Sequence, residues 1–140
     1  MLDELLATDG VLEESRLRGR VGFMALHGGL ETATYEIASE AAEASGASLY
    51  AVRQPWSLYW HVPSIQFDPS HSPALTDFLG HVGIVFSVHG FGRPGLESAL
   101  LLGGSHRPLA RRLGQALSAR GFDAIDEIHL AWRNQQSSRY

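Results

Sequence analysis

Two apolar runs that each end in the dipeptide His-Gly restrict the fold of this chain more than any other feature. Residues 21–26 lead into His27 and residues 83–88 lead into His89. The first run lacks polar alternation, which is typical of a strand buried on both faces of a parallel sheet, and we expect the second run to be buried as well. Because neighbouring parallel strands end at one sheet edge, where open α/β sheets bind ligands, we expect the two imidazoles to converge.

Helical patterns separate these runs and follow them. The sequence predicts helices over residues 32–44, 73–79 and 108–120. In the first helix Ile37, Ala41 and Ala44 would face the core, and Gly46 would end it. In the last helix the inward residues would be Leu109, Leu113, Ala116 and Leu117, with Gly121 as the terminal glycine. Further strand-like segments are residues 47–52, the apolar run 96–102, and residues 122–128.

The alternation of strands with helices predicts an α/β fold with an open, mixed, mostly parallel sheet flanked by helices. Residues 2–20 mix charged and apolar residues and predict a short helix or an irregular arm. We therefore expect an N-terminal arm over residues 1–20 and a single α/β hydrolase domain over residues 21–140. The length of 140 residues and the hydrophobic content of 44% fit one globular domain.

Composition argues against several classes of partner. The net charge of −4 and the absence of a basic stripe argue against a nucleic-acid partner. No stretch approaches the ~18 apolar residues of a membrane span, and the acidic N-terminus lacks the basic start of a signal peptide. We therefore expect a cytoplasmic protein that binds neither nucleic acid nor membrane.

The chain has no cysteine, so a metal site would need histidine and carboxylate ligands. Glu31 follows His27 by one helical turn's spacing, and His89 would complete a His-Glu-His set. Catalytic zinc sites that hydrolyse amides use such a set and leave a fourth position for water. The alternative is that both histidines simply form hydrogen bonds with the backbone of their turns.

The long irregular segment 54–72 is rich in proline and aromatic residues, which is typical of a binding surface. Within it, His61 could line a substrate groove, or the segment could be a hydrophobic anchor with an incidental histidine. Arg93 follows His89 in a glycine-rich loop, and a guanidinium can clamp a carboxylate, although a solvated arginine is the alternative. A serine triad is poorly supported, since Ser87 and Ser105 lie in no nucleophile-elbow motif.

Four motifs in a fixed order resemble those of the poly-γ-glutamate hydrolase family, whose members are phage-type zinc hydrolases. The motifs are His27-Gly28-Gly29-Leu30-Glu31 with Glu36-Ile37-Ala38, His61-Val62-Pro63-Ser64 with Phe67-Asp68, Ser87-Val88-His89-Gly90, and Leu102-Gly103-Gly104. The resemblance implies a fold similar to the zinc carboxypeptidases. It also implies hydrolysis of the γ-amide links of poly-γ-glutamate, an anionic γ-glutamyl polymer, or of a similar peptide.

On the matching positions, the resemblance implies that His27, Glu31 and His89 bind one Zn²⁺ and that His61 lies near the substrate. In the family, the general base is a glutamate in a late segment of Gln-Leu-Glu type, and nothing after Ile128 matches that segment. Asp126 precedes this region in surroundings that do not match, and the general base is therefore unknown. Two further hypotheses stay open: a truncated or catalytically impaired metal- or ligand-binding homologue, and a metal-free α/β domain.

Overall fold

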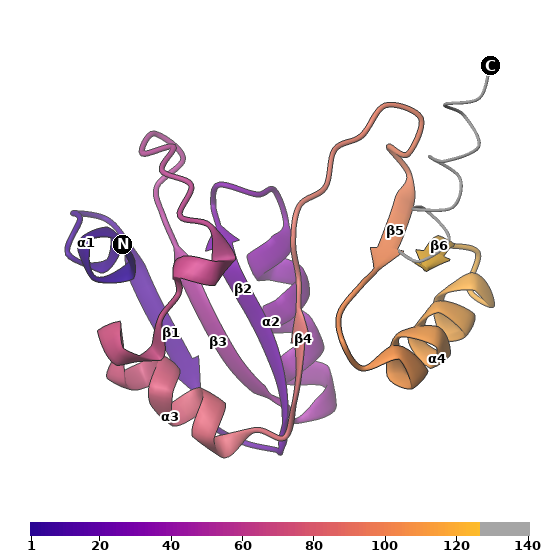
Figure 1. Ribbon diagram of the computed structural model, residues 1–140, viewed down its shortest axis with the longest axis horizontal. Helices are drawn as coiled ribbons and strands as arrows, with labels where there is room; N and C mark the ends of the chain where they lie inside the picture. The colour runs from indigo at the N-terminus through magenta and orange to yellow at the C-terminus, as the bar shows by residue number, and fades with distance from the viewer. Residues whose placement is uncertain (127–140) are drawn as a thin grey trace. The chain divides into compact units, whose positions relative to one another are not determined.

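The computed structural model describes residues 1–126, and these form an α/β fold with an open sheet (Figure 1). The chain divides into two compact units, Met1–Phe91 and Gly92–Tyr140. The regular elements of the first unit are α1 (Leu2–Leu6), β1 (Leu12–Arg16), β2 (Val21–Gly28), α2 (Thr34–Ser45), β3 (Ser48–Arg53), α3 (Pro73–His81) and β4 (Ile84–Ser87), with short 3-10 helices at Ser64–Gln66 and Pro69–His71.

The sheet of the first unit has the strand order β1-β3-β2-β4. Strand β2 is parallel to both β3 and β4, with Gly22 opposite Ser48 and Val21 opposite Ile84, whereas β1 is antiparallel to β3. The mostly parallel sheet predicted from the sequence is confirmed. Because β2 and β4 start in register and run the same way, the segments that follow them leave the sheet at the same edge.

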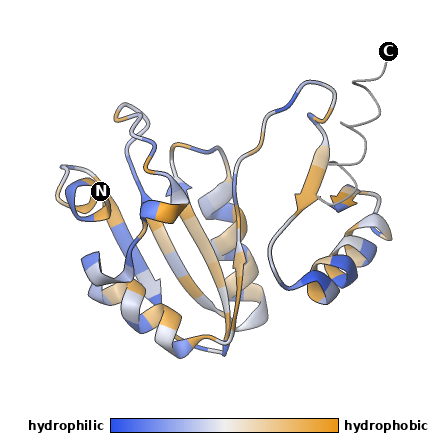
Figure 2. Cartoon of the chain, viewed as in Figure 1, coloured by the Kyte–Doolittle hydropathy of each residue, from blue (hydrophilic) through white to orange (hydrophobic). Residues whose placement is uncertain are grey.

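Strands β2 and β3 are buried on both faces, and their side chains alternate between two apolar clusters. Tyr50 and Val52 of β3 lie with Met24 of β2 in a cluster that includes residues of α1 and α3. Leu49 and Ala51 lie in a second cluster, which packs against α2. The apolar colouring of these two central strands is visible in Figure 2. Helices therefore cover both faces, which explains why the strands lack polar alternation.

Helix α2 is where the sequence predicts it, but its buried face is different. Thr34, Ala38 and Ala42 face the sheet, whereas Ile37 is 55% exposed. These three positions are spaced by four residues, so they line one side of the helix. Their small side chains let the helix pack closely on β2 and β3, which a stripe containing isoleucine would not allow. The predicted end is confirmed, because Gly46 takes the left-handed conformation with φ of 68°.

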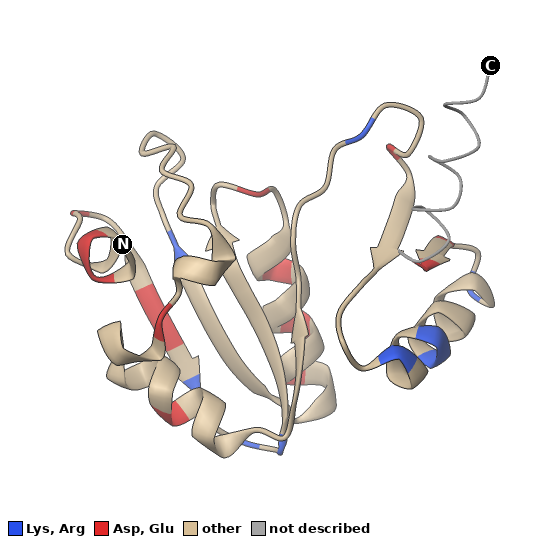
Figure 3. Cartoon of the chain, in the orientation of Figure 1, with Lys and Arg blue, Asp and Glu red and all other residues tan. Residues whose placement is uncertain are grey.

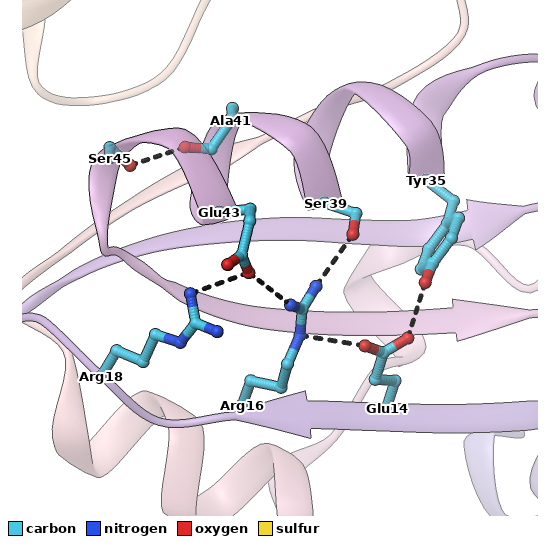
Figure 4. Close-up of polar contacts among 8 residues, drawn as sticks. All are labelled: Glu14, Arg16, Arg18, Tyr35, Ser39, Ala41, Glu43 and Ser45. Carbon is cyan, nitrogen blue, oxygen red and sulfur yellow. Dashed lines mark hydrogen bonds and ion pairs between the residues drawn. The ribbon is translucent and has the colours of Figure 1, made fainter.

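The predicted short helix near the N-terminus is present as α1, and Leu2 and Leu5 are fully buried in the core. Strand β1, which the sequence did not predict, follows it. Its charged side chains are paired rather than buried: Figure 4 shows Arg16 contacting Glu14 of the same strand, and Ser39 and Glu43 of α2. The division into an arm (1–20) and one domain (21–140) stays a prediction.

A polar network joins β1, β3 and α3. Glu13 of β1 accepts hydrogen bonds from the hydroxyl of Tyr50, at 2.7 Å, and from the hydroxyl of Ser72. The Ser72 hydroxyl also accepts from the backbone N–H of Leu75 and so caps helix α3. Burial, reinforced by Glu13, raises the pKa of Tyr50, so the hydroxyl keeps its proton and acts as a donor.

Strand β4 is less buried than the sequence predicted. Its two end residues, Ile84 and Ser87, are exposed, since β4 is an edge strand of the first unit's sheet. None of the helices in the described part of the chain has the length and apolar content that a membrane crossing requires.

The second unit contains β5 (Ala99–Leu102), α4 (Arg107–Ser118) and β6 (Asp123–Asp126), and its two strands pair in parallel. The predicted helix 108–120 is confirmed, with Leu109 and Leu113 on its half-buried side, although Ala116 is exposed. In Figure 3 the ribbon of α4 carries the blue of basic residues, whereas the red of acidic residues is prominent on α2 and β1 of the first unit.

The packing of α2 makes a testable prediction. The substitution Ala42→Leu should lower the free energy of unfolding by about 1–3 kcal/mol, because the larger side chain cannot fit between α2 and the sheet. Replacing Ile37→Ala should change it by less than about 0.5 kcal/mol, since Ile37 is exposed. Urea unfolding of both variants measures these changes. A larger loss for Ile37→Ala than for Ala42→Leu would contradict the observed helix face.

Candidate metal centre

The loop after β2 brings Glu31 back beside His27. The backbone N–H groups of Leu30 and Glu31 both donate to the His27 carbonyl, at 3.1 and 2.8 Å, which closes a tight turn. Gly29 has a φ of +79°, and a Cβ there would lie 2.1 Å from the carbonyl oxygen of Gln54. This position therefore requires glycine, both for its backbone conformation and for the close approach of the Gln54 backbone.

A hydrogen bond to the backbone fixes the tautomer of His27, whose side chain is only 2% exposed. Its Nε2 lies 2.9 Å from the carbonyl oxygen of Val62. A carbonyl can only accept, so Nε2 carries the proton and, in the neutral ring, Nδ1 carries the lone pair. This Nδ1 atom is shielded from solvent, has no hydrogen-bond partner, and lies 3.2 Å from Oε1 of Glu31. Two acceptors face each other there, and a cation between them, or a second proton on His27, would make the arrangement favourable.

His89 approaches the same carboxylate from the segment after β4. Its Nδ1 lies 3.7 Å from Oε2 of Glu31, and its Nε2 lies 2.9 Å from the Ser87 hydroxyl. The backbone N–H of Gly90 donates to Oε2 of Glu31 at 2.7 Å and so orients the carboxylate. Burial lowers the pKa of His89, and the charge of Glu31 only partly opposes this shift. The neutral ring that a metal ligand requires is thereby favoured.

The predicted convergence of His27, Glu31 and His89 is confirmed. One donor atom from each residue lies within 4.8 Å of the other two. Donors of a tetrahedral zinc site are about 3.4 Å apart, given ligand distances of 2.0–2.1 Å. The 3.2 Å between His27 and Glu31 agrees with that spacing. The donor set and the lone pair on a buried, unpaired nitrogen therefore fit a zinc ion, and the role of the three residues as ligands stays a prediction.

The irregular segment after β3 serves both as a core anchor and as a wall of the site. Val62 and Phe67 are buried in the main cluster, and the Phe67 ring meets His27 edge-on at 5.8 Å. His61 is exposed and stacks on His27, with ring centroids 4.6 Å apart. The hydrophobic anchor expected of this segment is confirmed by Val62 and Phe67, and His61 lies beside His27, a predicted metal ligand. Its contact with substrate stays a prediction.

Two functional partners of the histidines were missed in the sequence. The Val62 carbonyl is a backbone group, which no side-chain pattern can reveal. Ser87 was considered only as a nucleophile, yet its hydroxyl orients His89. The alternation of a strand could have suggested this contact, because residues two apart share one side.

Two further residues considered in the sequence, Arg93 and Asp126, belong to the second unit. The role of Arg93 beside the histidines stays a prediction. Asp126, which we did not assign as the general base, is paired with Arg107 within the second unit. Glu127 and all later residues lie outside the described residues.

Comparison with known protein families gives a match to the model described as poly-gamma-glutamate hydrolase, and the match extends over residues 4–138. No curated protein and no solved structure matches the chain. The matched range includes His27, Glu31, His61 and His89.

The grouping of donors predicts a zinc content that depends on both histidines. Purified protein should contain about one zinc per chain, and His27→Ala or His89→Ala should lose most of it, since the loss of even a residue that orients a ligand typically costs 10–100-fold in metal affinity. The control is His81→Ala, because His81 lies at the end of α3 and contacts the Arg18 carbonyl instead. Elemental analysis of the four proteins measures the metal, and equal zinc in all four would contradict the site.

Proposed function

The chain belongs to the poly-gamma-glutamate hydrolase family, and on that premise we propose that it is a zinc-dependent amidohydrolase that cleaves γ-glutamyl amide bonds. The single observation that carries the zinc dependence is the buried, unpaired Nδ1 of His27, which faces Glu31 at 3.2 Å. An unpaired buried polar atom costs free energy unless a ligand satisfies it. A zinc ion would supply what this pair of acceptors lacks.

The chain's own residues prepare the site. The chemistry that a bound zinc ion supplies is polarisation of the scissile carbonyl and a lowered pKa, near 7, for a coordinated water. The Val62 carbonyl holds the proton of His27 on Nε2, and the Ser87 hydroxyl contacts Nε2 of His89, so both rings present Nδ1 to the centre. The Gly90 N–H holds the Glu31 carboxylate in position. Such outer contacts orient ligands and contribute substantially to metal affinity.

We assign the substrate side to His61 and Arg93. Poly-γ-glutamate carries one free α-carboxylate on every residue, because its links use the γ-carboxyl groups. His61 is exposed beside His27 and could donate to a substrate carbonyl or carboxylate. Arg93 follows His89 closely in the sequence, and its guanidinium suits paired hydrogen bonds to a carboxylate.

A second candidate is a binding homologue that keeps the metal and the groove but does not turn substrate over. This candidate applies if the protein has no general base, and none of residues 1–140 is assigned that role. A missing general base typically costs on the order of 10²–10⁴-fold in rate. The two candidates therefore differ in turnover and agree on metal binding.

A chelation experiment tests the hydrolase. The protein should release new amino groups from poly-γ-glutamate, lose this activity when a chelator removes its metal, and regain it when zinc is added back. His27→Ala should stay inactive after zinc addition. Amine release and the size distribution of the polymer measure the reaction. Zinc-dependent binding of the polymer without any cleavage would favour the binding homologue instead, and full activity in the presence of chelator would contradict zinc dependence.

The Arg93 assignment makes its own prediction. Arg93→Ala should raise KM for an anionic γ-glutamyl substrate by roughly tenfold, because a charge-assisted pair of hydrogen bonds is lost. Arg111→Ala, an exposed position on α4, is the control for the change in net charge. Steady-state kinetics over a range of substrate concentrations separate KM from kcat, and an unchanged KM in Arg93→Ala would show that the assignment is wrong.

A further inference from the structure

A second feature of the first unit points to substrate recognition beside the metal centre. A pocket of about 280 Å³ adjoins the loop after β2, and its lining includes Leu12, Gly29, Tyr35, Glu36, Arg53 and Gln54. Ligand pockets usually measure about 300–1,000 Å³, so this one suits a small group rather than a whole substrate. Gly29 lies in the turn between the predicted ligands His27 and Glu31, so the pocket and the centre share one piece of backbone.

Arg53 supplies the charge in this pocket. It is the last residue of β3 and lies opposite Gly28 in the sheet, and its Cγ would be 2.9 Å from a Cβ at Gly28. Its guanidinium carbon lies 4.3 Å from the ring centroid of Tyr35, a cation–π contact. The Tyr35 hydroxyl donates to Glu14 at 2.8 Å (Figure 4). The guanidinium is therefore held against a ring that is itself held in place.

This guanidinium has no anionic partner among residues 1–126. Its Nε is shielded from solvent and has no hydrogen-bond partner, and no carboxylate of the described residues forms an ion pair with it. A solvated surface arginine would keep water on its Nε, so that role does not fit. An unpaired buried donor costs free energy, and a planar guanidinium satisfies it best with a carboxylate that accepts two parallel hydrogen bonds.

We propose that Arg53 and its pocket bind a free α-carboxylate of the γ-glutamyl substrate. The proposal rests on the proposed function, because it places this carboxylate on the chain whose amide bond lies at the centre formed by His27, Glu31 and His89. Tyr35 fixes the guanidinium in advance, which reduces the entropy lost on binding. Glu36 also lines the pocket, and its negative charge opposes the carboxylate and so limits affinity.

The test measures binding directly, with a γ-linked glutamate pentamer and with the same pentamer whose α-carboxylates are converted to amides. Arg53→Met should raise the Kd for the acidic pentamer by about tenfold or more, as expected for loss of a charge-assisted pair of hydrogen bonds. It should leave the Kd for the amidated pentamer unchanged. Glu36→Gln should tighten binding of the acidic pentamer severalfold. Titration calorimetry on the full chain, with zinc added, gives all these constants.

Two controls distinguish the loss of the Arg53 contact from a general effect of net charge or of folding. Arg20→Met removes the same charge from an exposed residue at the opposite end of β2, and it should change neither Kd. Arg53→Lys keeps the charge and the apolar stem but loses the planar guanidinium, so it should raise the Kd for the acidic pentamer severalfold. Melting temperature and zinc content are recorded for each protein. If Arg53→Met does not fold, Arg53→Lys and Glu36→Gln carry the test.

The outcomes distinguish this proposal from the proposed function. Arg53-dependent binding of the acidic pentamer supports the carboxylate pocket whether or not the pentamer is hydrolysed, and a lack of hydrolysis then counts only against the hydrolase. Hydrolysis with an unchanged Kd in Arg53→Met and Arg53→Lys overturns the pocket and leaves the hydrolase standing. Equal weakening for acidic and amidated pentamers also overturns it, since the contact would then not be with a carboxylate.

Discussion

The hydrogen bond between Nε2 of His27 and the Val62 carbonyl is the interaction on which the rest of the site depends. It links the carboxyl end of the central strand β2 to the long segment after β3, and it decides which ring nitrogen carries the proton. If it were lost, Nδ1 could be protonated and donate to Glu31, which would satisfy the pair without a metal. The chemistry proposed for the centre therefore depends on a backbone contact as much as on the three predicted ligands.

The parallel pairing of β2 with β4 is the second feature on which the site depends. Strands that start in register and run the same way bring His27 and His89 to one edge, where their ring centroids lie 5.4 Å apart. The tight turn at Gly29 then places Glu31 between the two rings. Each predicted ligand is thus positioned by a different feature: His27 by a strand end, Glu31 by a glycine turn, and His89 by the segment after a neighbouring strand.

The sequence was sufficient for features that depend on local patterns. Apolar runs predicted β2 and β3, Gly46 predicted the end of α2, and the two His-Gly dipeptides predicted the convergence of the histidines. It was insufficient where long-range packing decides. Strand β1 was missed because its charged residues are paired across elements rather than buried, and the inward face of α2 is set by the small side chains that the sheet accepts. The Arg53 pocket was also missed, because it forms only when β3, α2 and the glycine loop meet.

The position of β1 in the sheet has a consequence for how the chain folds as it is synthesised. Leu12–Arg16 is synthesised well before its partner Ser48–Arg53, so its backbone groups stay unpaired until β3 has emerged. An unpaired strand in a nascent chain is exposed to association with other chains. Glu13, Glu14 and Arg16 make β1 a poor template for such association. The same charged residues that kept β1 from being predicted as a strand therefore also lower the risk of association with other chains before β3 has been synthesised.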